Sequence, residues 1–65
     1  MIVGVVSKPK LENLDEIQKE LNNFFKDKDC SLIYDKNFPV KSVGKNKVYS
    51  QKNLVKKADL ILVFG

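Results

Sequence analysis

Two uninterrupted apolar runs constrain the fold of this chain more than any other feature of its sequence. They cover residues 2–6 (IVGVV) and residues 60–64 (LILVF). A strand with one face in water alternates apolar and polar residues, whereas a strand buried on both faces is apolar throughout. Each run is therefore predicted to be a strand of a parallel sheet that is covered on both faces.

The segment that follows the first run has the periodicity of an amphipathic helix, predicted within residues 11–29. Its apolar residues recur at spacings of three and four, which places them on one helix face. They are Leu14, Ile17, Leu21, Phe24 and Phe25. Asn13 and Glu16 resemble a capping arrangement at its start. Residues 31–35 (SLIYD) read as a second, more polar strand, so the unit is a strand–helix–strand crossover of parallel type.

Residues 36–49 have no clear period, because Pro39, Gly44 and Asn46 favour turns. This segment is left open between a loop and a small hairpin that includes residues 48–49. Ser50 is then placed to cap a short helix. The residues of that helix that should face inward are Leu54, Val55 and Ala58.

The polar character of residues 31–35 predicts that this strand lies at an edge of the sheet. The three strands then take the order 2-1-3, with residues 2–6 in the middle. This arrangement is the β-α-β-α-β half of a doubly wound α/β sheet, Rossmann-like or phosphofructokinase-like. The third strand, residues 60–64, keeps a free apolar edge, and we expect the isolated chain to self-associate through it.

Composition excludes several classes of site. The sequence has one cysteine, Cys30, and no histidine, so it cannot form an internal disulfide or a zinc site of the Cys/His type. A single unpaired cysteine without a secretory signal suits the reducing cytosol, so a cytoplasmic location is predicted. No apolar run approaches the roughly 20 residues that a membrane-spanning helix needs, and no membrane partner is expected.

The basic charge is concentrated in one segment. Residues 36–57 carry seven lysines and no acidic residue, in a chain whose net charge is +4. This segment is either a solvated loop or a surface for polyanions such as nucleotide, polyphosphate or nucleic acid. Phe38 and Tyr49 are its only aromatic residues, too few for a base-stacking platform. The solvated loop is the preferred interpretation, and nucleic acid is not the expected partner.

The candidate ligand site follows from the strand order. Open parallel sheets bind ligands at the carboxyl ends of their strands, where the order reverses. Here that crevice lies between the first and third strands, beside residues 7–10 (SKPK) and Gly65. Gly65 lets backbone N–H groups approach a phosphate, and Lys8 and Lys10 can meet its charge. A turn glycine and two solvated lysines are the simpler alternatives. Asp35 is interpreted as a strand-end residue, because no Gly-x-Gly-x-x-Gly motif follows the first strand.

Taken in order, IVGVVSKPK, LDEIQKELNNFF, CSLIYD and LVKKADLILVFG resemble the amino-terminal part of NAD kinases. In that family an Ala-Asp pair precedes the third strand, which runs into a Gly-Gly-Asp-Gly-Thr motif. Ala58 and Asp59 match the pair, and Gly65 matches the first glycine of the motif. The resemblance implies phosphorylation of the 2′-hydroxyl of the NAD ribose to give NADP, with ATP or polyphosphate as donor and Mg²⁺ offsetting charge. With Gly65 as part of the motif, and with Lys8 and Pro9 in the loop after the first strand, these three residues are the candidates for the nucleotide site.

The resemblance further implies parts that these 65 residues do not include. They are the aspartate of the motif, which is the family's candidate base, and a C-terminal β-rich domain that completes the dinucleotide site and the oligomer interface. We therefore expect a homo-oligomeric full protein and no NADP formation by the 65 residues alone. Two other interpretations remain open: a nucleotide-binding half-domain of another enzyme, and a small basic module that binds nucleic acid through residues 36–57 with steep salt dependence.

Overall fold

The computed structural model of the chain describes residues 1–9, 11–38 and 47–64. Its described elements form an α/β unit with one four-stranded sheet, in the order β3-β2-β1-β4, in which every neighbouring pair is parallel. The predicted α/β fold class is therefore confirmed. In chain order the elements are β1 (Ile2–Ser7), α1 (Leu14–Phe25), β2 (Ser31–Asp35), β3 (Val48–Tyr49), α3 (Gln51–Lys57) and β4 (Leu60–Phe64).

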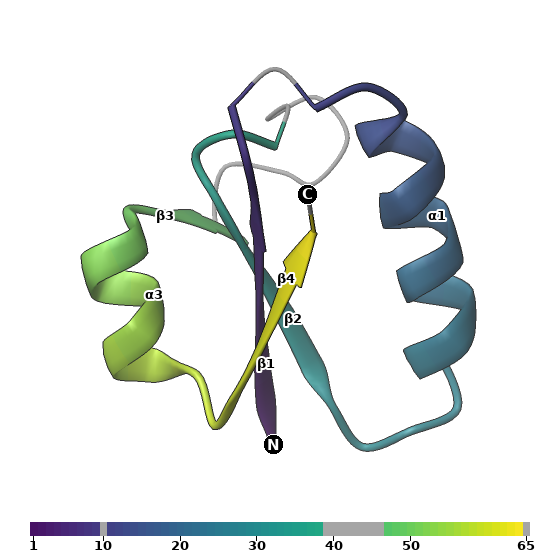
Figure 1. Cartoon of the computed structure of the whole chain (residues 1–65). Helices are drawn as coiled ribbons and strands as arrows, with labels where there is room; N and C mark the ends of the chain where they lie inside the picture. The colour runs from purple at the N-terminus through teal and green to yellow at the C-terminus, as the bar shows by residue number, and fades with distance from the viewer. Residues whose placement is uncertain (10, 39–46, 65) are drawn as a thin grey trace.

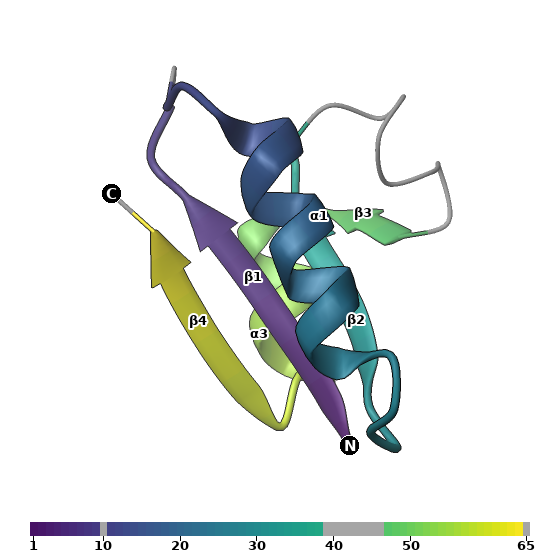
Figure 2. The same ribbon diagram turned by 90° about the vertical axis from the view of Figure 1, so that its right-hand side faces the viewer.

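The two helices cover opposite faces of the sheet, as both ribbon views show (Figures 1 and 2). On the α1 face, apolar side chains of β1 and β2 form a buried core with Phe38, and four residues of α1 pack against it. Those four residues are Leu14, Ile17, Leu21 and Phe25. On the other face, Leu54 of α3 is fully buried beside Gly4 of β1. No helix in the described part of the chain is long and apolar enough to cross a membrane.

The strand order agrees with the predicted order 2-1-3 for the three strands it included, since β1 lies between β2 and β4. The prediction that residues 31–35 lie at the sheet edge is wrong, because β3 pairs with Tyr34 and Asp35. The polarity of β2 had a different cause: its acidic residue, Asp35, is buried and hydrogen-bonded within the molecule. Val48–Tyr49 is a short parallel strand beside β2, and residues 39–46 lie outside the described residues.

Two details of the α1 prediction are also wrong. Phe24 does not face the core: it is 61% exposed, packs edge-on against Phe25, and has the ammonium of Lys28 4.1 Å from its ring centroid. Asn13 precedes the helix with φ 64°, in the left-handed region that asparagine tolerates, and its side chain makes no capping hydrogen bond. Its carbonyl oxygen instead accepts from the N–H of Ile17 at 3.0 Å.

The start of α3 agrees with its prediction. Ser50 has extended backbone angles, and its hydroxyl accepts a hydrogen bond from the N–H of Asn53 at 3.3 Å, so it caps the helix. Leu54 faces inward as predicted, and Ala58 is half-buried. Val55 was also predicted to face inward, but it is 60% exposed. A seven-residue helix turns only one narrow stripe toward the sheet, and Leu54 occupies it.

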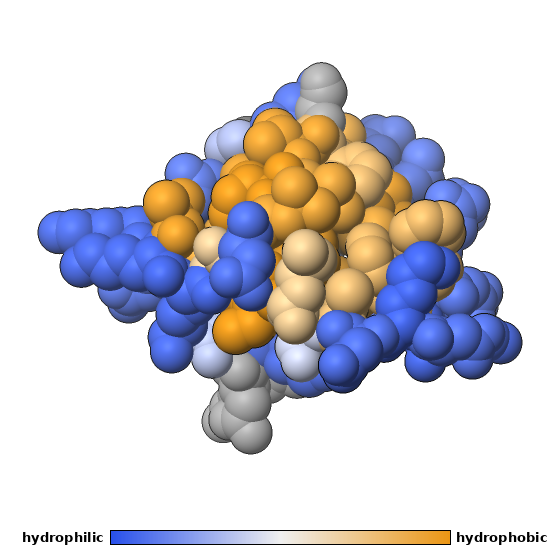
Figure 3. Space-filling model, turned by 90° about the horizontal axis from the view of Figure 1, so that it is seen from below, coloured by the Kyte–Doolittle hydropathy of each residue, from blue (hydrophilic) through white to orange (hydrophobic). Residues whose placement is uncertain are grey.

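β4 pairs with β1 on one side and with no other strand of the described chain on the other side. Its five residues are uncharged and apolar, and Val63 is 74% exposed. Met1 and Leu60 add exposed apolar surface at the lower end of the sheet, where Figure 3 shows apolar side chains gathered in one area. β4 thus has none of the charged or proline residues that protect edge strands.

We expect the chain to self-associate through this edge. Sedimentation velocity should show a sedimentation coefficient that rises with protein concentration. Val63→Lys should reduce the association because it places a charge on the exposed face of β4. The matched control is Val55→Lys, which adds the same charge to the exposed side of α3. A wild-type chain that stays monomeric at every concentration would contradict this prediction.

Candidate functional site

The carboxyl ends of β1, β2 and β4 lie at one end of the sheet, at the top of Figure 1. The chain leaves β1 through α1 on one face to reach β2, and it leaves β3 through α3 on the other face to reach β4. The direction of winding therefore reverses between β1 and β4. In open parallel sheets this reversal opens the crevice in which ligands bind. The candidate site is this end of the sheet, called the carboxyl edge below.

Of the residues predicted for this site, Lys8 and Pro9 follow β1 at the carboxyl edge and are exposed. The N–H of Lys8 donates to the carbonyl oxygen of Phe64 at 3.1 Å, so the loop after β1 is joined to the end of β4. The N–H of Lys8 is consequently used within the chain, while its ammonium group has no partner among the described residues. Gly65 and Lys10 lie outside the described residues.

Asp35 forms the centre of a polar cluster at the carboxyl edge and is 0% exposed. Its Oδ2 atom accepts from the N–H of Ser7 at 3.3 Å and from the side-chain amides of Asn37 and Gln51 at 3.4 and 3.2 Å. Its Oδ1 atom accepts from the N–H of Asn37 at 3.1 Å. The amide of Asn37 also donates to the carbonyl oxygen of Ser7 at 2.6 Å. The cluster thus ties together the ends of β1 and β2 and the first residue of α3.

This geometry determines what Asp35 can do. Both of its oxygens accept hydrogen bonds from the chain itself and none of its surface is exposed, so it is not positioned to hold the ribose of a dinucleotide. Its interpretation as a strand-end residue agrees with the structure. Sequence reasoning missed Asn37 and Gln51. The pattern Asp35-Lys36-Asn37 is a signal for the Asx turn that forms here. No local sequence pattern identifies Gln51, because it lies in α3, far along the chain from Asp35.

Two buried hydroxyl groups near the carboxyl edge lack hydrogen-bond partners among the described residues: Oγ of Ser7 and the phenolic oxygen of Tyr34. Ser7 is 1% exposed, and Tyr34 packs against the ring of Phe38 with centroids 4.9 Å apart. Burial raises the pKa of Tyr34 above its ordinary value of 10.0. A buried hydroxyl without a partner loses its hydration and gains no hydrogen bond in return.

Tyr34→Phe should therefore increase the free energy of unfolding, by about 1 kcal/mol, because it removes an unsatisfied hydroxyl and keeps the ring. The raised pKa gives the effect a pH signature. Above about pH 10 the unfolded chain releases the Tyr34 proton while the folded chain retains it, so the stability of the wild type falls as the pH rises. Urea unfolding between pH 8 and 11 should show a steeper decline for the wild type than for the variant. Equal slopes would contradict the burial of this group.

The described residues hold no group of three or more His, Cys, Asp or Glu side chains that could bind a metal ion. A cavity of about 360 Å³ lies away from the carboxyl edge, beside the end of α1 and the start of β2. The basic segment, residues 36–57, is only partly described. Within it, Phe38 is buried in the core and Tyr49 is half-buried under the ammonium of Lys57, so neither ring is presented for base stacking.

The sheet order and the two helices on opposite faces define an open parallel α/β unit. We found no protein-family model, no curated protein and no solved structure that matches this chain.

Proposed function

We propose that this chain is the first part of the nucleotide-binding domain of an NAD kinase, an enzyme that phosphorylates the 2′-hydroxyl of the NAD ribose to give NADP. The observation that supports the proposal is the hydrogen bond from the N–H of Lys8 to the carbonyl oxygen of Phe64. It brings the loop after β1 beside the end of the strand that, by resemblance, runs into the glycine-rich motif.

Each predicted site residue has a role in this proposal. The exposed ammonium of Lys8 attracts phosphate groups as a flexible point charge. Pro9 carries no N–H and restricts the backbone of the loop that follows β1. Gly65, which follows Phe64 in the sequence, would let a phosphate approach the backbone because it has no Cβ. In this proposal Lys8 and Gly65 contact the phosphates of ATP or polyphosphate and of NAD, and Pro9 keeps the loop that carries Lys8 in place.

Mg²⁺, when bound with the phosphates, would offset negative charge on the transferred group. The described residues do not fit a metal site, since no three acidic or other ligating side chains gather and the oxygens of Asp35 accept hydrogen bonds from the chain. No step is therefore assigned to a metal held by these residues. The base that takes the proton of the 2′-hydroxyl is also assigned to none of them, and the 65 residues alone should form no NADP.

The test uses the natural gene product. Its intact mass is measured, and its formation of NADP from NAD is assayed with ATP and with polyphosphate. A mass several times the 7.4 kDa of these residues, together with NADP formation, is the expected result. Lys8→Ala in that product should raise the KM for the phosphoryl donor, whereas Lys52→Ala on α3 should not. A product that forms no NADP with either donor would overturn the proposal. NADP formation by the 65 residues alone would contradict the expectation that they are inactive by themselves.

A further inference from the structure

The cavity of about 360 Å³ lies at the end of the sheet opposite to the carboxyl edge. Its lining combines the last turn of α1, the turn after it, the start of β2 and the residue before β3. Eight side chains line it: Asn22, Phe25, Lys26, Lys28, Cys30, Ser31, Leu32 and Lys47. None of them has a role in the proposed function, and the lining contains three lysines and no carboxyl group.

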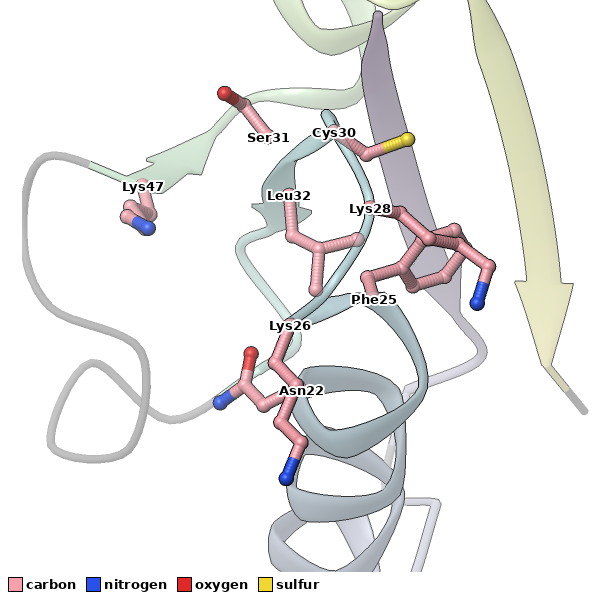
Figure 4. A pocket seen from close by; sticks show the side chains of 8 residues that line it. All are labelled: Asn22, Phe25, Lys26, Lys28, Cys30, Ser31, Leu32 and Lys47. Atoms are coloured by element: carbon pink, nitrogen blue, oxygen red, sulfur yellow. The ribbon is translucent and has the colours of Figure 1, made fainter.

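The three lysines stand around the cavity rather than on one side of it. In Figure 4, Leu32 lies in the middle of the group, with Lys47 on one side and Lys28 on the other. Lys26 and Lys47 form no ion pair with any described residue. The ammonium of Lys28 is already engaged: it donates to the carbonyl oxygen of Phe24 at 2.9 Å and lies 4.1 Å from the centroid of the Phe24 ring, which is not part of the lining. Lys26 and Lys47 bring positive charge to the lining, which contains no carboxylate to offset it, and this charge attracts an anion.

The backbone that carries these lysines is held by hydrogen bonds. The N–H of Lys28 donates to the carbonyl oxygen of Phe25 at 3.0 Å, and the N–H of Cys30 donates to that of Lys28 at 2.8 Å. The N–H of Ser31 donates to the carbonyl oxygen of Met1 at 2.9 Å. The backbone of this turn is therefore already ordered before a ligand binds. Less backbone conformational entropy is then lost on binding. Asp27 and Asp29 alternate with the lysines in this turn, but neither lines the cavity.

The rest of the lining suits a ligand with an apolar part. Leu32 is buried and Phe25 is half-buried, so they form an apolar floor, while Asn22 and Ser31 supply neutral hydrogen-bonding groups. A volume of this size is at the lower end of the range for small-molecule pockets. Lysine binds phosphate as a point charge. We propose that this cavity, called the lysine cavity below, binds a small phosphate monoester with an apolar or aromatic body.

Phenyl phosphate is the probe, and a titration followed by amide chemical shifts is the measurement. The expected result is a saturable shift of the amides of residues 30–32 that benzyl alcohol, a neutral molecule with a similar ring, does not cause. The double variant Lys26→Gln/Lys47→Gln should bind phenyl phosphate at least tenfold more weakly. The matched control is Lys52→Gln/Lys56→Gln, which removes the same charge from α3 and should change the affinity less than twofold.

Cys30 gives a second readout, because it is one of the lining residues and the only cysteine in the chain. Its rate of alkylation by the anion iodoacetate is compared with that by neutral iodoacetamide. The ratio should fall severalfold in Lys26→Gln/Lys47→Gln but not in the control, and phenyl phosphate should slow both reactions. All four substituted lysines are exposed, so each variant should retain the fold, which its far-UV circular dichroism spectrum verifies.

Three outcomes would overturn the proposal. The first is a shift that does not saturate, the second is an equal loss of affinity in both double variants, and the third is a set of shifted amides confined to Ser7 and Lys8. The third outcome would place phosphate binding at the carboxyl edge and would leave the proposed function standing. Saturable binding at residues 30–32 in a protein that makes no NADP would support the lysine cavity and overturn the proposed function. The two proposals can therefore fail separately.

Discussion

Gly4→Val should destabilise the chain by about 3 kcal/mol or more, because no side chain fits between β1 and α3. A Cβ atom on Gly4 would lie 2.5 Å from Cδ2 of Leu54, and 3.0 Å from both Cβ of Ala58 and Cδ1 of Ile61. The branches of valine would extend further into the same atoms. Since a domain of 65 residues has a total stability of roughly 3 to 10 kcal/mol, much of the variant should be unfolded at 25 °C.

Urea unfolding followed by circular dichroism measures this loss, at a protein concentration low enough to limit self-association. Gly4→Ala should give a smaller loss, because the nearest atom is the end of the flexible Leu54 side chain. Leu54→Ala should restore part of the stability lost in Gly4→Val, because it removes the closest contact. The double variant would then be more stable than the sum of its single changes predicts. A Gly4→Val chain as stable as the wild type would mean that α3 does not pack on β1 as described.

Asp35→Ala should cost about 1 to 3 kcal/mol, because it leaves the buried N–H of Ser7 and the partly buried donors of Asn37 and Gln51 without this acceptor. The donors come from Ser7, Asn37 and Gln51, and the first of them joins β1 to the end of β2. The loss should therefore loosen the carboxyl edge as a whole. Amide hydrogen exchange in the variant should show weakened protection at Ser7 and Asn37, and urea unfolding should show the lost stability.

Asp59→Ala is the matched control for this change. Asp59 is also an acidic residue beside a strand, and its Oδ2 atom accepts from the N–H of Ile2 at 2.8 Å, but this hydrogen bond is exposed to water. Water can replace the lost acceptor, so the cost should be about 1 kcal/mol or less. Similar losses for both variants would show that the burial of Asp35 has no special importance for stability.

Much of the fold could be predicted because its elements carry strong local patterns. The apolar runs of β1 and β4 and the three-and-four spacing in α1 specify those elements without tertiary information. The serine cap of α3 was equally clear. The polarity of β2 did not show whether the strand lies at the edge of the sheet or inside it. An acidic residue such as Asp35 can be buried when neighbouring N–H groups donate hydrogen bonds to it. β3 has only two residues and no local pattern of its own.

The candidate site was only partly predictable, for a related reason. The choice of the carboxyl edge as the candidate site follows from the strand order, and the sequence places Lys8 and Pro9 directly after β1. The polar cluster around Asp35 depends on residues from three separate elements, which only the folded chain brings together. The lysine cavity also joins distant segments, since Lys47 belongs to the residues before β3 and Lys26 follows α1. The sequence shows how many lysines the chain has, but it does not show which of them lie together in the folded chain.

The all-parallel pairing of β1 has a consequence for how this chain folds. β1 is synthesised before both of its neighbours: its paired residues in β2 lie 29 positions later, and those in β4 lie 57 positions later. Among the described strands, no two that are consecutive in the chain pair as a hairpin, so each of their ladders must close a long loop before it gains a hydrogen bond. Folding should therefore be slow for a chain of this size. During synthesis on the ribosome, one edge of β1 stays unpaired until β4 has emerged.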